Sequence, residues 1–289
     1  MTDQTFNIET ATAQNGGLEF IFENGKREGW EPGIDDMSVF PAVDPTGFFV
    51  GIVEGRIVGC VSGVKYNDDY GFIGYYIVLP EERGKGYGLK LFQHAVKYLG
   101  DRNIGLDGLL VQVPNYQKSG FQSYHATPRF QGNGTGPSES AAENIVPLSA
   151  VDAAQLAAYD RKHFPAPRAP WLQKWMGGIP GWHTGAYMEG GSIRGYAVMR
   201  PCITGFRLGP LYADTPDIAR KLMAYMRAQL AENQTFFIDV PECNQTGIAF
   251  AKDELGLTKL WDCIRMYTKG EPEGVNWGEV YGVSSLELG

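Results

Sequence analysis

Hydrophobic and polar positions follow two different periods along this chain, and each change of period marks a predicted element. Apolar residues that alternate with polar ones predict strands, whereas apolar residues spaced three and four apart predict helices. In the first half, the pattern predicts strands at 6–10, 47–53, 57–66, 71–78, 109–113 and 121–129. It predicts helices at 18–27, 35–43, 115–119 and from the end of a glycine-rich loop at 83–88 to about residue 99.

The second half repeats this order of elements without an obvious residue-level repeat. Helices are predicted at 153–160, 170–176, 216–231 and 245–255, and strands at 184–189, 193–201, 206–213, 235–240 and 259–267. Between the halves, residues 132–140 are rich in glycine, serine and proline and have no apolar period, which is typical of a linker. With 289 residues, the chain is long enough for two domains. We therefore predict domains at 1–131 and 141–289.

Charge and composition argue against several classes of function. The formal net charge is -8 and no long basic run is present, so nucleic acid is not an expected partner. The first residues lack the features of a signal peptide, and no apolar run approaches the roughly 20 residues that span a bilayer. We expect a cytoplasmic protein without a membrane partner. The four cysteines and four histidines are dispersed, so neither a disulfide nor a metal site is expected.

The stretch Ile77–Leu91 has the order of an anion site. An apolar strand ends before Pro80, a basic glycine-rich loop follows, and a helix begins directly after it. Backbone N–H groups of such a loop and of the helix N-terminus converge on one point, where phosphate groups bind. The glycines do not have the GxGxxG spacing of a dinucleotide site, and the GxxxxGK[ST] phosphate loop is absent.

The loop resembles the pyrophosphate motif RxxGxG of the GNAT superfamily of N-acetyltransferases. It consists of Arg83, Gly84, Lys85, Gly86, Tyr87 and Gly88, and it follows the V-x-P of Val78–Pro80, as in that family. The resemblance implies an α/β fold with a mixed, mostly antiparallel sheet and helices on both faces. It also implies that acetyl-CoA is the cosubstrate, with its pyrophosphate on the loop and its pantetheine arm beside the backbone of Ile77 and Val78.

A second resemblance lies at Asn115–Phe121, where YxxxGF is similar to the motif after the fifth strand of that superfamily. It implies that Asn115 contacts coenzyme A and that Tyr116 is the general acid that protonates the leaving thiolate. With ordinary pKa values of about 10 for tyrosine and 8.5 for a thiol, the transfer is at most roughly 2 kcal/mol uphill. The general base stays open among Asp68, Asp69, Glu81 and Glu82.

The region in which this superfamily builds its acceptor pocket contains Trp30, Asp35, Phe72 and Tyr75, each of which is equally explained as a core or surface residue. The stretch Arg168–Trp171 is a further candidate for the wall of an acceptor cleft, and packing within its own domain is the alternative.

The second half departs from the motif. Its equivalent helix follows Asp214, with Thr215 as the expected N-cap and Pro216 and Asp217 in the first turn. We expect this half to keep the fold but to lack the cosubstrate. Three of its features, Asp239–Pro241, the strand with Arg265–Tyr267 and the final SSLELG, resemble the C-terminal partner domain of tandem GNAT proteins.

These observations predict an acetyl-CoA-dependent N-acetyltransferase that moves the acetyl group directly to an amine of a small molecule. Two alternatives remain open, namely a non-catalytic acyl-CoA sensor and a scaffold that recruits a protein through its second domain. The acceptor, the acyl chain length and a homo-oligomeric state are not determined by the sequence.

Overall fold

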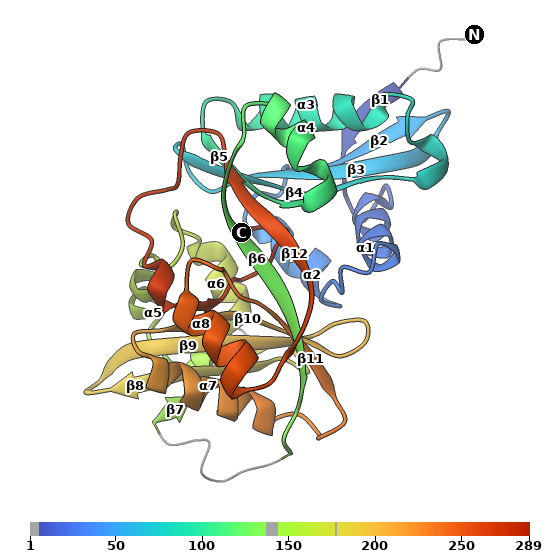
Figure 1. Ribbon diagram of the computed structural model, residues 1–289. Coiled ribbons are helices and arrows are strands. Elements are labelled where there is room, and N and C mark those ends of the chain that lie inside the picture. The colour runs from blue at the N-terminus through green and yellow to red at the C-terminus, as the bar shows by residue number, and fades with distance from the viewer. Residues whose placement is uncertain (1–5, 137–143, 177) are drawn as a thin grey trace.

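A computed structural model describes residues 6–136, 144–176 and 178–289 (Figure 1). Its strands form one 13-stranded sheet in the order β1-β2-β3-β4-β5-β12-β6-β11-β10-β9-β8-β7, with β13 paired to β10. Most neighbours are antiparallel, and β4 with β5 and β10 with β11 are parallel. The predicted mixed α/β sheet is therefore confirmed.

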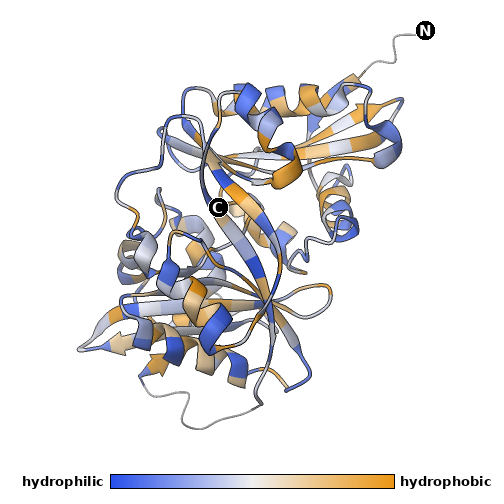
Figure 2. Ribbon diagram, viewed as in Figure 1, coloured by the Kyte–Doolittle hydropathy of each residue, from blue (hydrophilic) through white to orange (hydrophobic). Residues whose placement is uncertain are grey.

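The first half contains the strands β1 Phe6–Thr10, β2 Phe48–Val53, β3 Arg56–Lys65, β4 Tyr70–Val78, β5 Asn103–Leu109 and β6 Gln122–Asn133. Its helices are α1 Gly17–Arg27, α2 Asp36–Val39, α3 Tyr87–Leu99 and α4 Val113–Lys118, with short 3-10 turns η1 Phe40–Ala42, η2 Pro80–Glu82 and η3 Leu110–Gln112. Strands β2 to β4 are mostly apolar (Figure 2), because α3 covers one face and α1 the other. Thus Val61 packs with Leu91 of α3, whereas Cys60 packs with Ile21 of α1.

The second half has the same arrangement around its own helix α7. Its strands are β7 Ile145–Val146, β8 His183–Glu189, β9 Ser192–Pro201, β10 Phe206–Ala213, β11 Thr235–Asp239, β12 Thr258–Tyr267 and β13 Val280–Gly282. Its helices are α5 Ala153–Asp160, α6 Ala169–Met176, α7 Pro216–Ala228 and α8 Gln245–Ala249, the last continued by a π turn, Phe250–Glu254. The 3-10 turns are η5 Leu148–Ala150 and η7 Trp277–Glu279. None of the described helices combines the length and apolar character that a membrane crossing requires.

The two halves are joined by strands that they share. Strand β12 belongs to the second half by sequence, yet it lies between β5 and β6 of the first half, with Tyr267 opposite both Gly105 and Gln122. The far end of β6 pairs with β11, and Figure 1 shows β6 and β12 running together from one half to the other. The two halves consequently share a core in which Tyr75, Trp171 and Leu288 belong to one cluster.

The predicted linker at 132–140 stays a prediction. Strand β6 continues to Asn133, and residues 137–143 lie outside the described part of the chain.

One predicted strand is wrong. The structure places β5 at Asn103–Leu109, whereas residues 110–112 of the predicted strand 109–113 form a 3-10 turn in which Val111 is 80% exposed. The apolar run LVQV resembles a strand more than NIGLDGL does, because β5 carries two glycines and an aspartate. Both glycines serve packing, since a Cβ at Gly105 would meet Tyr70 and Phe72 and one at Gly108 would meet Tyr116.

Strands β4 and β5 splay apart at one end. The parallel pairing of the two strands ends at Ile73 and Leu106. Directly afterwards Tyr75 has a positive φ of 45°, and the register of β4 against β3 shifts, which is a β-bulge. Beyond this bulge the strands diverge, and the edge of β4 that faces β5 has no strand partner there among the described residues.

Candidate active site

A cavity of about 650 Å³ fills the space between the splayed strands. One wall is β4 from Ile73 to Val78, and the opposite wall is β5 with Leu106, Asp107 and Leu109. The loop after β4 and the first turn of α3 close one end. The second half supplies a further wall, which consists of Trp261, Cys263, Leu286 and Glu287. The cavity is therefore built by both halves of the chain.

The loop between β4 and α3 presents backbone donors to this cavity. Gly84 and Gly86 have φ values of 80° and 85°, in the left-handed region that favours glycine, and Gly86 is the N-cap of α3. Within the described chain, no protein group accepts a hydrogen bond from the N–H groups of residues 84–89. Free N–H groups at a helix N-terminus, together with the helix dipole, form an anion site.

The basic side chains of the loop already have acidic partners. Arg83 Nη2 lies 2.6 Å from Glu28 Oε1, and its Nε donates to the carbonyl oxygen of Val78 at 2.9 Å. Lys85 Nζ lies 2.8 Å from Glu82 Oε2, and the same carboxylate also pairs with Arg56. An anion at this loop would consequently meet backbone N–H groups more than unpaired positive charge.

The structure brings together most of the residues that the sequence indicates as a site. Ile77, Val78, Arg83, Gly84, Gly86, Tyr87, Gly88 and Tyr116 all line the cavity. Lys85 and Asn115 do not line it, and the exposed Asn115 donates from its amide to Gln112 Oε1 at 2.9 Å. The roles of these residues towards coenzyme A stay predictions.

Tyr116 lies on α4, at the side of the cavity opposite β4. Its ring packs against Phe92 and Phe121, with centroid distances of 5.5 and 6.3 Å. It also lies against Gly108, in space that a Cβ atom there would occupy. No described residue forms a hydrogen bond with its hydroxyl. Burial raises the pKa of Tyr116 above its ordinary value. The hydroxyl is therefore protonated at neutral pH, as a proton donor must be, although it is a weaker acid than a free tyrosine.

The candidate bases named from the sequence are poorly placed. Asp68 and Asp69 are exposed in a turn, and Asp68 pairs with Arg102 at 3.2 Å. Glu81 pairs with Arg56 at 3.2 Å outside the cavity, and Glu82 lines the cavity but holds two cations. These contacts favour structural roles for all of them.

The candidates for the acceptor pocket divide into two groups. Trp30 and Tyr75 line the cavity, whereas Phe72 is buried in the core and Asp35 accepts a hydrogen bond from Trp182 Nε1 at 3.0 Å. In the stretch Arg168–Trp171, Arg168 and Trp171 are buried, whereas Ala169 and Pro170 are exposed. Its tryptophan packs edge-on against Phe40 of the first half at 5.7 Å, so its contacts are not confined to the second half.

Sequence reasoning missed the wall from the second half, above all Glu287. This residue is 4% exposed, and it lies more than 200 positions along the chain from β4. The only local signal is a carboxylate between two apolar residues, Leu286 and Leu288, in the final SSLELG. Periodicity alone cannot show that this tail packs into a cavity of the other half.

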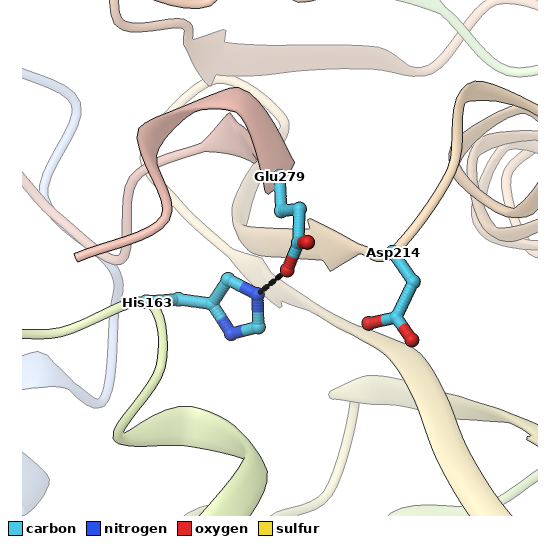
Figure 3. Close-up of side chains that lie close together, drawn as sticks. All are labelled: His163, Asp214 and Glu279. Atoms are coloured by element: carbon cyan, nitrogen blue, oxygen red, sulfur yellow. Dashed lines mark hydrogen bonds and ion pairs between the residues drawn. The ribbon is translucent and has the colours of Figure 1, made fainter. Parts of the chain in front are cut away.

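A second cluster of polar side chains lies outside the cavity (Figure 3). The ligand atoms of His163, Asp214 and Glu279 lie within 4.8 Å of one another, a geometry that could hold a metal ion. Each of them already has protein partners. His163 Nε2 lies 2.9 Å from Glu279 Oε2, and Asp214 accepts from Tyr159 and pairs with Arg194 at 3.1 Å. These contacts explain the cluster as a structural one.

The second half has no counterpart of the anion loop at α7. Thr215 is the N-cap, its side chain accepts from the N–H of Ile218 at 3.3 Å, and Pro216 is at the first helical position. The expected capping of this helix is confirmed.

Comparisons with known proteins agree with this architecture. A family model described as "Acetyltransferase (GNAT) family" matches residues 18–121, and one described as "Acetyltransferase (GNAT) domain" matches residues 156–282. Among curated proteins, holothin acyltransferase from Pseudoalteromonas sp. (strain SANK 73390) is 32% identical over 284 residues, which cover 97% of this chain and 95% of that protein.

Solved structures share the fold at lower identity. A Pyrococcus horikoshii protein described as a candidate acetyltransferase has a TM-score of 0.81 at 20% identity, over 100% of this chain and 98% of its own. A tandem GNAT protein from the clavulanic acid biosynthesis pathway has a TM-score of 0.61 at 13% identity, over 91% of this chain and 98% of its own. Together with the cavity described above, these matches show that the chain belongs to the GNAT acetyltransferase family, with two domains of that family in tandem, and is an acyltransferase.

Proposed function

We propose that this protein transfers the acetyl group of acetyl-CoA directly to the amine of a small molecule, in a complex that holds both substrates. One observation carries the proposal. A single cavity joins the free N–H groups of residues 84–89 at one end to the hydroxyl of Tyr116 along its side. In this proposal the N–H groups bind phosphate and Tyr116 donates a proton, and the cavity of about 650 Å³ connects the two.

The groups that line the cavity fit coenzyme A in order along its length. The N–H groups of residues 84–89 suit the pyrophosphate, because glycine at 84 and 86 lets the backbone approach the oxygens. The free edge of β4 beyond Ile73 suits the amides of an extended pantetheine arm, which pair with a strand edge as an added strand does. The volume suffices for this arm and a small acceptor together.

The chemistry needs three proton movements. The acceptor nitrogen loses one proton before attack and a second as the amide forms, and the leaving thiolate gains one, for which the cavity offers a donor. An alkylammonium with a pKa of about 10.4 costs about 4.6 kcal/mol to deprotonate at pH 7, so a base must assist. The neutral amine attacks the thioester carbonyl carbon, and the carbon–sulfur bond breaks as the intermediate collapses. Tyr116 then donates its proton to the leaving thiolate, and the resulting tyrosinate takes the second proton of the nitrogen as the amide forms. The products are an N-acetyl amide and the free thiol.

The acceptor is a small molecule in this proposal because the wall from the second half limits the space beyond the thioester. Trp261, Leu286 and Glu287 close that side of the cavity. Holothin, which the name of the 32% identical relative gives as its substrate, is a suitable first acceptor to test.

The proposal is tested with purified protein, acetyl-CoA and a panel of alkylamines, amino acids, aminoglycosides and holothin. Thiol release is measured and corrected for hydrolysis of acetyl-CoA, and products are identified by mass spectrometry. We expect amine-dependent thiol release with at least one acceptor and slower turnover with longer acyl-CoA donors. Binding of acetyl-CoA without acetylation of any amine would contradict the proposal and favour an acyl-CoA sensor.

A further inference from the structure

We infer that Glu287, from the tail of the second half, is the group that receives the proton of the acceptor amine. This inference rests on the proposed function. It assigns the base that the sequence left open, and it gives the second half a direct part in the reaction.

The position of Glu287 is fixed by contacts of the tail with the first half. A Cβ at Gly74 of β4 would lie 2.0 Å from the carbonyl oxygen of Glu287, so the backbones touch beside the bulge at Tyr75. Tyr66 donates from its hydroxyl to the carbonyl oxygen of Leu288 at 2.7 Å. The tail therefore lies where β4 and β5 begin to diverge.

Other carboxylates that line the cavity are already occupied. Glu28 accepts from Arg83 at 2.6 Å, and Glu82 accepts from Arg56 and Lys85. Both oxygens of Asp107 accept from Arg265, at 2.8 and 2.7 Å. A carboxylate held in this two-bond geometry has a strong partner that competes with a substrate proton.

Glu287 differs from these residues in its free oxygen. Its Oε1 lies 3.7 Å from Arg207 Nη1, and its Oε2 is buried without a hydrogen-bond partner in the described part of the chain. Buried polar atoms nearly always have a partner, so an exception on a cavity wall points to a ligand. A carboxylate oxygen only accepts, and the matching ligand group is therefore an N–H or O–H donor.

A donor that reaches Glu287 Oε2 meets a second polar group without a partner in the described chain. The neighbouring Tyr75 also lines the cavity and also has a buried hydroxyl without a partner among the described residues. Arg207 does not depend on Glu287, because it donates to Asp239 at 2.7 Å and to the carbonyl oxygens of Trp30 and Glu31. The titratable groups that share an electrostatic interaction with Glu287 are Tyr75, Asp107, Arg207 and Cys263.

Each proton of the reaction then has a defined donor and acceptor. An N–H bond of the bound ammonium breaks, its proton passes to Glu287 Oε2, and the nitrogen lone pair forms the bond to the acetyl carbon. The electrons of the carbon–sulfur bond leave with sulfur, which takes the proton of Tyr116. The nitrogen of the intermediate still carries two protons, and one of them passes to the tyrosinate of Tyr116 as the amide forms. Glu287 then gives its proton to solvent, so each turnover releases one proton and restores both residues.

The test compares Glu287→Gln and Glu287→Asp with wild type on two acceptors. One is an alkylamine, which is protonated at pH 7, and the other is an aromatic amine, which is neutral there and needs no base before attack. Glu254→Gln, a substitution at an exposed surface pair with Arg220, is the matched control. Calorimetric titration with acetyl-CoA shows whether each variant retains a folded site.

With the alkylamine, we expect Glu287→Gln to lower kcat at pH 7 by about 10²–10⁴-fold. Its log kcat should rise by one per pH unit towards the pKa of the amine. The kcat of Glu287→Asp should fall less than that of Glu287→Gln, because aspartate keeps the carboxylate. With the aromatic amine, the variants should stay within a few-fold of wild type.

Four outcomes would be decisive against the inference. Equal losses with both amines would indicate a merely structural role, and unchanged alkylamine turnover in Glu287→Gln would overturn the assignment while leaving the proposed function intact. A wild type that acetylates no amine would instead refute the proposed function, and the inference with it. If Glu287→Gln does not bind acetyl-CoA, Glu287→Asp carries the test, and equal rates of Glu287→Asp and wild type with the alkylamine overturn the assignment.

Discussion

The carbonyl oxygen of Glu287 lies so close to Gly74 that a Cβ atom at this glycine would be 2.0 Å from it. Real Cβ atoms do not approach backbone oxygens this closely, so only glycine is compatible with this contact. The contact joins the last residues of the chain to the strand that begins the splay. It explains why the cavity needs both halves of the protein.

Replacement of Gly74 by alanine should therefore displace the tail. We expect the free energy of unfolding to fall by about 1–3 kcal/mol, since the clash is with backbone, and amine acetylation to fall because Glu287 moves. Thermal unfolding and steady-state kinetics measure both effects. Gly278→Ala is the control, because no heavy atom lies within 4 Å of its Cβ position. Equal behaviour of the two variants would refute the role of this contact.

A pair of glycine substitutions separates backbone strain from anion binding. Gly86 and Gly190 both have a positive φ, 85° and 56°, and neither has an atom within 4 Å of its Cβ position. Alanine at either site should cost about 1–2 kcal/mol of stability. Only Gly86→Ala should weaken the binding of acetyl-CoA. Calorimetry should show an affinity lower by roughly 10–100-fold, because hydrogen bonds to a charged group contribute about 1.5–3 kcal/mol. Similar affinities in both variants would place the phosphates elsewhere.

Tyr116→Phe tests the proton donor. We expect kcat to fall by about 10²–10⁴-fold while the dissociation constant of acetyl-CoA stays the same. Tyr124→Phe, at a residue 38% exposed and outside the cavity lining, is the control. Because burial raises the pKa of Tyr116, its hydroxyl stays protonated up to at least about pH 10. A wild-type rate that declines between pH 8 and 9 through loss of this proton would argue against Tyr116.

A pH dependence of stability follows from His125 on the shared strand β6. Burial, with a smaller effect of Arg265, lowers the pKa of His125 to about 4. The unfolded chain, with a histidine pKa of about 6.5, then binds more protons than the folded one between pH 4 and 6.5. Stability should fall by about 3 kcal/mol as the pH decreases through this range. The free energy of unfolding, measured with denaturant at several pH values, should change less with pH in His125→Gln than in wild type between pH 4 and 6.5. Above pH 7.5 the two proteins should show the same pH dependence.

Much of the fold could be predicted because its elements depend on local periodicity. Helices such as α3 and α7 place apolar residues on one face, and strands such as β9 are bounded by turn residues. Strand β5 was misplaced because its glycines and Asp107 are explained by neighbours from other strands. The sharing of β12 between the halves depends on pairing at a sequence separation of more than 100 residues, which no local pattern records.

The candidate site divides in the same way. The loop at 84–88 is a contiguous motif whose conformation follows from its glycines, so local reasoning reaches it. Glu287 cannot be recognised from its neighbours in sequence. Its unpaired oxygen becomes evident only from the packing of the tail beside Gly74 and Tyr75. The pairing of Arg83 with Glu28 is a similar long-range feature, and it removes an unpaired charge that the motif had indicated.

A crystal structure of the protein with acetyl-CoA tests the central claim most directly. The account predicts the pyrophosphate within hydrogen-bonding distance of the N–H groups of residues 84–89 and the acetyl group between Tyr116 and Glu287. Electron density for the cosubstrate at another surface, or a pyrophosphate that contacts none of these N–H groups, would contradict it.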